Sequence, residues 1–214
     1  MDQTQHIPSL AHLREFSRAR NSGRATHVAA DRQQVTAARD SKFFAFTYEK
    51  FLTAVIDYVN HGCRGSELER AVENAPARMR ASYESAAKGI AHLFEELQPI
   101  AARRRQKNIV AVDDNGDDLV SLRVHLLLEL ANGGQAAALI YFSERRLAPV
   151  EMALMETATA LAVSQLDPAL IPALLVARTG ELRFIDSREA TSPDRIAFLH
   201  EEAAAYRQEW ALSA

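Results

Sequence analysis

Residues 119–143, LVSLRVHLLLELANGGQAAALIYFS, contain the two segments that determine the fold class. In Leu119–Leu130 apolar residues recur at every second position, and this period of two predicts one long β-strand. The predicted apolar face consists of Val120, Leu122, Val124, Leu126, Leu128 and Leu130. Gly133 and Gly134 predict a turn, after which Ala136–Ser143 is apolar on both faces. A strand of that kind is typical of the centre of a sheet.

The flanking segments predict the rest of the sheet. Asn108–Val112 is rich in β-branched residues, and Asn115-Gly116 after it is a strong hairpin signal. Pro149 begins an Ala-rich, apolar helix over residues 149–166, which we expect to be buried. Strands over 170–177 and 182–186 follow, and Ser192 and Pro193 begin a last helix. A right-handed crossover through helix 149–166 would make strands 136–143 and 170–177 parallel.

The N-terminal half is predicted to be helical. Residues 42–60 and 77–97 carry apolar stripes at helical spacing, and Phe44, Tyr48 and Phe51 suit the first stripe to cover one face of the sheet. We therefore predict an α+β fold in which N-terminal helices precede a mixed β-β-β-α-β-β sheet and a C-terminal helix. The expected organisation is a poorly ordered or short-helix arm over 1–40 and one domain over 41–214, with a helical part (41–106) and a sheet part (107–214).

The composition of the chain limits the cellular compartment and the kinds of partner that we expect. Cys63 is the only cysteine, which excludes an internal disulfide, and no apolar run is long enough to span a membrane. The chain opens without a secretory signal pattern, so we expect a cytoplasmic protein without membrane contact. Residues 1–112 hold 17 Lys and Arg against 12 Asp and Glu, whereas residues 113–214 hold 8 against 16. Such asymmetry can mark a half that faces a polyanion, or it can reflect solvated helix faces.

The common catalytic and cofactor motifs are absent. The sequence contains no phosphate-binding glycine loop, no dinucleotide-binding glycine pattern and no Gly-x-Ser-x-Gly nucleophile turn. His200-Glu201 begins like a metalloprotease helix, but Ala204 stands where the second histidine ligand is needed. The acidic residues 113–118 lack the spacing of a calcium loop and are interpreted as a hairpin tip. No metal and no cofactor are therefore predicted.

The order of elements resembles the core of the PD-(D/E)XK nuclease superfamily. An amphipathic helix, three meandering strands, a buried helix and a further strand cover roughly residues 77–178. The resemblance implies an Asp on the second core strand and Glu-x-Lys on the third, which would hold a divalent metal. Here His125 stands closest to the expected Asp, and Leu139-Ile140-Tyr141-Phe142 offers neither carboxylate nor lysine. The resemblance therefore implies a nuclease-like scaffold from which the catalytic residues have been lost.

Two groups of polar residues are candidate sites. Arg123, His125 and Glu129 share one face of the predicted strand 119–130, where they could line a cleft or simply bond to neighbouring groups. A second group could contact phosphates or could be a solvated helix end. It consists of Arg78, Arg80, Arg103, Arg104, Arg105 and Lys107.

Three functions remain open. The sequence favours a non-catalytic protein that binds a macromolecule or assembles with itself. The alternatives are a nucleic-acid-binding protein that uses the arginine-rich segment, and an enzyme whose site forms only in three dimensions.

Overall fold

The computed structural model describes residues 6–19, 23–36, 48–105 and 107–213. The helices are α1 (Leu10–Arg18), α2 (Arg24–Thr36), α3 (Glu49–Asn60), α4 (Glu67–Glu73), the 3-10 turn η3 (Ala77–Met79), α5 (Arg80–Leu97), α6 (Pro149–Leu166), α7 (Ser187–Ala190) and α8 (Pro193–Leu212). The strands are β1 (Ala101–Arg104), β2 (Ile109–Val112), β3 (Asp118–Leu122), β4 (Leu126–Glu129), β5 (Gln135–Tyr141), β6 (Ile171–Val176) and β7 (Glu181–Phe184). These elements confirm the predicted α+β class.

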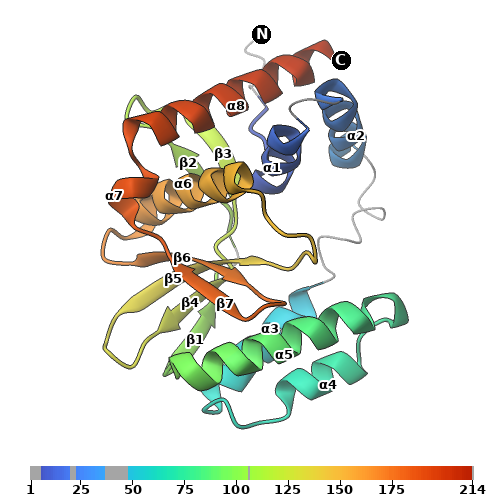
Figure 1. Cartoon of the computed structure of the whole chain (residues 1–214), viewed down its shortest axis with the longest axis vertical. Helices are drawn as coiled ribbons and strands as arrows, with labels where there is room; N and C mark the ends of the chain where they lie inside the picture. Colours follow the sequence, from blue (N-terminus) through green and yellow to red (C-terminus); the bar gives the residue numbers. More distant parts are fainter. Residues whose placement is uncertain (1–5, 20–22, 37–47, 106, 214) are drawn as a thin grey trace.

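The main sheet has five strands in the order β1-β4-β5-β6-β7 (Figure 1). β5 is central: it pairs antiparallel with β4 and parallel with β6. The crossover helix α6 connects β5 to β6 along the chain. Six of the seven residues of β5 are buried, as its apolar sequence predicts. β2 and β3 form a separate two-stranded sheet, which is the predicted hairpin.

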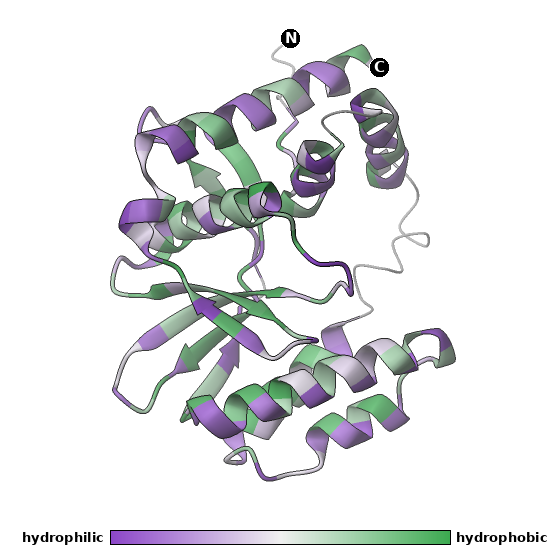
Figure 2. Ribbon diagram, viewed as in Figure 1, coloured by the Kyte–Doolittle hydropathy of each residue, from purple (hydrophilic) through white to green (hydrophobic). Residues whose placement is uncertain are grey.

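Helices cover both faces of the five-stranded sheet. On one face α3, α4 and α5 contribute to a core with β4, β5 and β6, which is built around large side chains such as Phe51, Ile90 and Phe94. On the other face α6 packs with α1, α8 and the β2–β3 sheet (Figure 1). Hydrophilic and hydrophobic residues follow one another along the outer helix α8, whose buried apolar residues are Leu199, Ala203 and Tyr206 (Figure 2).

The predicted single strand 119–130 is wrong, because the chain bends at Arg123–His125 and continues as two strands in different sheets. The bend divides the predicted apolar face between the two cores. Val120 and Leu122 pack with α6 and α8, whereas Leu126 and Leu128 pack with α3 and α5. The apolar and polar residues alternate without a break because each of the two strands buries one face in a core of its own.

The sheet also begins earlier than predicted. Residues 101–104 lie in the region expected to be helical, yet they form the edge strand β1 and pair with β4 in the register Ala102↔Leu128. The predicted helix over 42–60 is present from Glu49 to Asn60, and Phe44 lies outside the described residues. Tyr48 and Phe51 do pack over the end of β5, where the ring of Tyr48 stacks on Phe142 at 4.0 Å.

The N-terminal arm contributes to the core. Leu10, Leu13 and Phe16 on one side of α1 are buried against α6 and α8, and Val28 of α2 joins them. The spacing of the three α1 residues is that of a helix face, which explains why so short a segment can dock. Among the described residues, no helix combines the length and the apolar composition needed to cross a membrane.

Candidate functional site

A groove of about 390 Å³ opens where β3 and β4 diverge. Its walls are the start of α1, the bend between β3 and β4, and the end of β5. The polar residues of its lining are Ser9, Arg14, Asn108, Ser121, Arg123, His125, Tyr141 and Ser143, and the apolar ones include Leu10, Leu122, Leu139, Ile140, Phe142 and Met155. The N-terminal segment holds the bend in place, since the Ser121 N–H donates to the carbonyl of Pro8 at 2.8 Å.

His125 lines this groove in a fixed protonation state. Its Nδ1 accepts a hydrogen bond from the backbone N–H of Ile140 at 2.9 Å, so the proton of the neutral ring must be on Nε2. Burial lowers the pKa of His125 to about 4, and the guanidinium groups of Arg123 and Arg104 act in the same direction. No hydrogen-bond partner for Nε2 lies among the described residues. At neutral pH His125 is therefore a hydrogen-bond donor, and no residue in the described ranges accepts from its Nε2–H.

Arg123 and Arg104 share one carboxylate at the side of the groove. Glu49, the first residue of α3, accepts a hydrogen bond from Arg123 at 2.7 Å and also pairs with Arg104. All three side chains are about three-quarters buried. Two cations against one anion leave the cluster with a net positive charge, and burial together with Arg123 lowers the pKa of Arg104.

The structure brings together only part of each predicted site. Glu129 does not line the groove: it lies at the far end of β4, exposed, opposite Ala101 and Gln135. From the basic group, Arg104 and Arg105 reach the bend, where the Arg105 N–H donates to the His125 carbonyl at 3.4 Å.

The remaining basic residues lie elsewhere. Arg103 and Lys107 are exposed next to this cluster, but neither lines the groove. Arg78 and Arg80 are exposed at the start of α5, at the opposite end of that helix from β1. The residues predicted to contact phosphates therefore do not form one patch.

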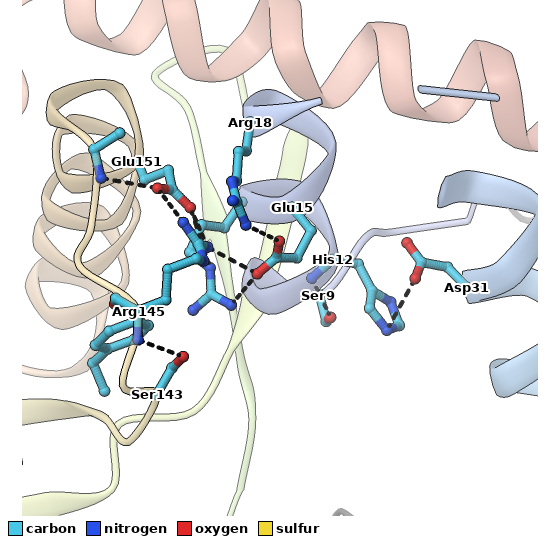
Figure 3. Close-up of polar contacts among 11 residues, drawn as sticks. Ser9, His12, Glu15, Arg18, Asp31, Ser143, Arg145 and Glu151 are labelled. Atoms are coloured by element: carbon cyan, nitrogen blue, oxygen red, sulfur yellow. Dashed lines mark hydrogen bonds and ion pairs between the residues drawn. The ribbon is translucent and has the colours of Figure 1, made fainter. Parts of the chain in front are cut away.

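A buried ion-pair network supports the groove wall, and sequence analysis did not find it (Figure 3). Glu151 of α6 is 0% exposed and accepts two hydrogen bonds from Arg145, at 2.6 and 2.8 Å. Arg145 also donates to Glu15 of α1 at 3.0 Å, and so ties α1 to the loop after β5. Glu151 accepts the Ala148 N–H as well, and the Pro149 start with Glu151 two residues later is the sequence signal of that cap.

One group of described residues has the composition of a metal site. Asp113, Asp117 and His200 place one ligand atom each within 4.8 Å of one another. The Asp113 carboxylate already accepts the N–H groups of Asn115 and Asp117, at 2.9 Å each. These bonds close the turn between β2 and β3, in agreement with the interpretation of residues 113–118 as a hairpin tip.

The groove is therefore rich in hydrogen-bond donors around an apolar floor, and none of the described residues that line it carries a carboxylate. No protein-family model matches the chain, and no curated protein matches it either.

Proposed function

We propose that the chain is a non-catalytic binding protein on a nuclease-like scaffold, and that the groove at the divergence of β3 and β4 is its binding site. The observation that carries the proposal is the state of His125. Its Nδ1 accepts the Ile140 N–H, and none of the described residues accepts a hydrogen bond from its neutral Nε2–H, which we assign to the ligand. A side chain of this kind donates a hydrogen bond and does not accept a proton at neutral pH.

The residues around His125 argue against metal-dependent hydrolysis. In the resemblance to the nuclease core, the second and third strands supply the carboxylates that hold the metal. The matching parts of this chain are the β3–β4 bend, which carries Arg123 and His125, and β5, whose buried residues are apolar apart from Tyr141. Cations and aliphatic side chains do not bind a hard, oxygen-seeking cation.

The same residues define the chemistry of the ligand. His125 Nε2–H and the net positive charge of the Arg104–Glu49–Arg123 cluster favour a ligand that carries negatively charged acceptors. Leu139, Ile140 and Met155 favour one that also carries apolar side chains. An acidic, partly apolar peptide segment of a protein partner combines both properties.

This proposal can be tested by titrating the isotope-labelled full chain with a short acidic peptide that has Leu at alternate positions. We expect amide shifts at the bend and at the end of β5, and none with the matched peptide in which Asn replaces each Asp. Ser121→Trp fills the groove and should remove the shifts, whereas Ser187→Trp on the exposed helix α7 should keep them.

Two results would overturn the proposal. One is the absence of peptide-induced shifts up to millimolar concentration. The other is cleavage of DNA or RNA in the presence of magnesium or manganese that disappears in His125→Ala, because His125 would then serve catalysis.

Nucleic-acid binding is a second candidate, and one observation favours it. The arginine-rich segment ends at the groove, where Arg105 bonds to the backbone of His125 and Arg103 and Lys107 are exposed beside it. Binding through these cations should weaken steeply with salt. The triple variant Arg103→Glu, Arg105→Glu, Lys107→Glu spares the structural pair of Arg104, and fluorescence anisotropy with labelled single-stranded oligonucleotides should show whether it abolishes binding. Binding that is indifferent to salt and to this variant would exclude the second candidate.

A further inference from the structure

β7 is an edge strand, at the opposite side of the sheet from β1. In the part of the chain that the structure describes, no strand pairs with its outer edge. Glu181, Arg183 and Phe184 are exposed, with Phe184 at 48%. An unpaired edge with an exposed aromatic residue is a template for a further strand.

The backbone of β7 presents hydrogen-bonding groups outward at defined positions. Ile185 N–H donates to the Pro172 carbonyl at 2.8 Å, and the antiparallel register pairs Arg183 with Leu174. Since bonded and non-bonded positions alternate along an antiparallel strand, Glu181 and Arg183 bond inward to β6. The N–H and C=O groups of Leu182 and Phe184 therefore point away from the sheet.

The side chains on either side of Leu182 carry opposite charges. Glu181 and Arg183 lie on the same face of β7 and form an ion pair of 3.2 Å. Arg183 also lies 3.8 Å from the carboxylate of Glu156 in α6. Glu181 and Arg183 are 55% and 44% exposed, so both remain accessible to a charged group from outside the chain.

We propose that β7 pairs antiparallel with β7 of a second copy of this chain, centred on Leu182. In this register the two Leu182 residues exchange N–H···O=C bonds through their outward groups, and Glu181 of each copy faces Arg183 of the other. Each carboxylate then lies between two guanidinium groups. A register centred on Arg183 would place like charges opposite each other, which is unfavourable.

The contact is self-complementary and closes as a twofold dimer with one continuous sheet. It adds self-assembly to the proposed binding function and does not depend on the groove. Because β7 is only four residues long, the contact buries little surface and the dimer is weak.

The test uses sedimentation equilibrium of the full chain and of two charge variants, with circular dichroism to verify that each is folded. The wild-type chain should approach the mass of a dimer as its concentration rises towards the millimolar range. Glu181→Arg places two cations beside Leu182, and Arg183→Glu places two anions there, so each variant alone should remain a monomer. An equimolar mixture of the two variants restores opposite charges across the contact and should recover the dimer.

Three results would overturn the proposal: a monomeric wild-type chain, single variants that dimerise as the wild type does, or a mixture that stays monomeric. None of these results bears on the groove, because Glu181 and Arg183 do not line it.

Discussion

The backbone N–H of Ile140 donates to Nδ1 of His125 at 2.9 Å, and this bond joins the start of β4 to the end of β5. It lies beside a backbone bond at the end of the β4–β5 register, in which the His125 N–H donates to the carbonyl of Ala138, the residue that pairs with Leu126. The imidazole thus takes the place of a backbone acceptor where the chain turns from one sheet into the other. The same bond sets the tautomer that the proposed binding site requires.

His125 should make stability fall as the solution becomes acidic. Burial, then Arg123 and Arg104, lower the pKa of His125 from 6.5 to about 4 in the folded chain. Between these values the unfolded chain binds a proton that the folded chain does not. The contribution is therefore complete above pH 6.5 and is lost as pH falls towards 4, by up to about 3 kcal/mol.

The control for this prediction is His125→Asn, whose side-chain oxygen can still accept the Ile140 N–H but does not titrate. Urea unfolding at several pH values should show a smaller loss of stability for this variant between pH 6.5 and 4. Identical pH profiles for the two chains would contradict the assigned state of His125.

Glu151→Gln should destabilise the fold by about 2–4 kcal/mol, because it leaves the guanidinium of Arg145 without its buried counterion. Glu144→Gln is the matched control: Glu144 also pairs with an arginine, Arg178, but is 78% exposed, and its loss should cost under about 1 kcal/mol. Chemical unfolding of both variants measures the difference. Equal effects would mean that the network in Figure 3 does not hold α1 against the β5–α6 loop.

Gly89 lies where α5 crosses the turn between β6 and β7. A Cβ at this position would be 2.2 Å from the Ala177 carbonyl oxygen and 2.8 Å from the Gly180 nitrogen, which are backbone atoms and cannot simply move aside. We expect Gly89→Ala to cost about 2–3 kcal/mol through displacement of the helix.

Gly62→Ala provides the comparison, since Gly62 has a φ of +75° but nothing within 4 Å of its added Cβ. Only the backbone conformation opposes that change, so the cost should be about 1 kcal/mol. Thermal melts that rank Gly62→Ala as the more damaging variant would argue against close packing of α5 on the sheet.

Much of the fold follows from local patterns in the sequence. The continuous apolar run of Ala136–Ser143 predicts a central strand, and Gln135–Tyr141 is one. The Ala-rich segment 149–166 predicts a buried crossover helix, and α6 matches these bounds. In both segments most residues are buried whichever way they point, so local composition is enough to predict the element.

Other features depend on contacts that no local pattern encodes. Apolar and polar residues alternate without a break through Arg123–His125, because the strands on both sides of the bend need apolar residues at every second position. The period of the sequence therefore cannot show where the chain passes from one sheet to the other. The segment Ala101–Arg104 contains no β-branched residue, so its sequence does not predict a strand. It forms β1 because it pairs with β4. The groove is formed by the bend between β3 and β4, the end of β5 and the start of α1, and α1 is distant from the other two in sequence.

The most direct test of the account is nitrogen NMR of the His125 ring in the folded chain between pH 4 and 8. We predict a neutral ring with the proton on Nε2 across most of this range, a midpoint of titration near 4, and a change in the Nε2 signal when the acidic peptide binds. A proton on Nδ1, or a midpoint at or above the ordinary histidine value of about 6.5, would contradict it. His125 would then be free to act as a base, and the groove would have to be interpreted as a catalytic site.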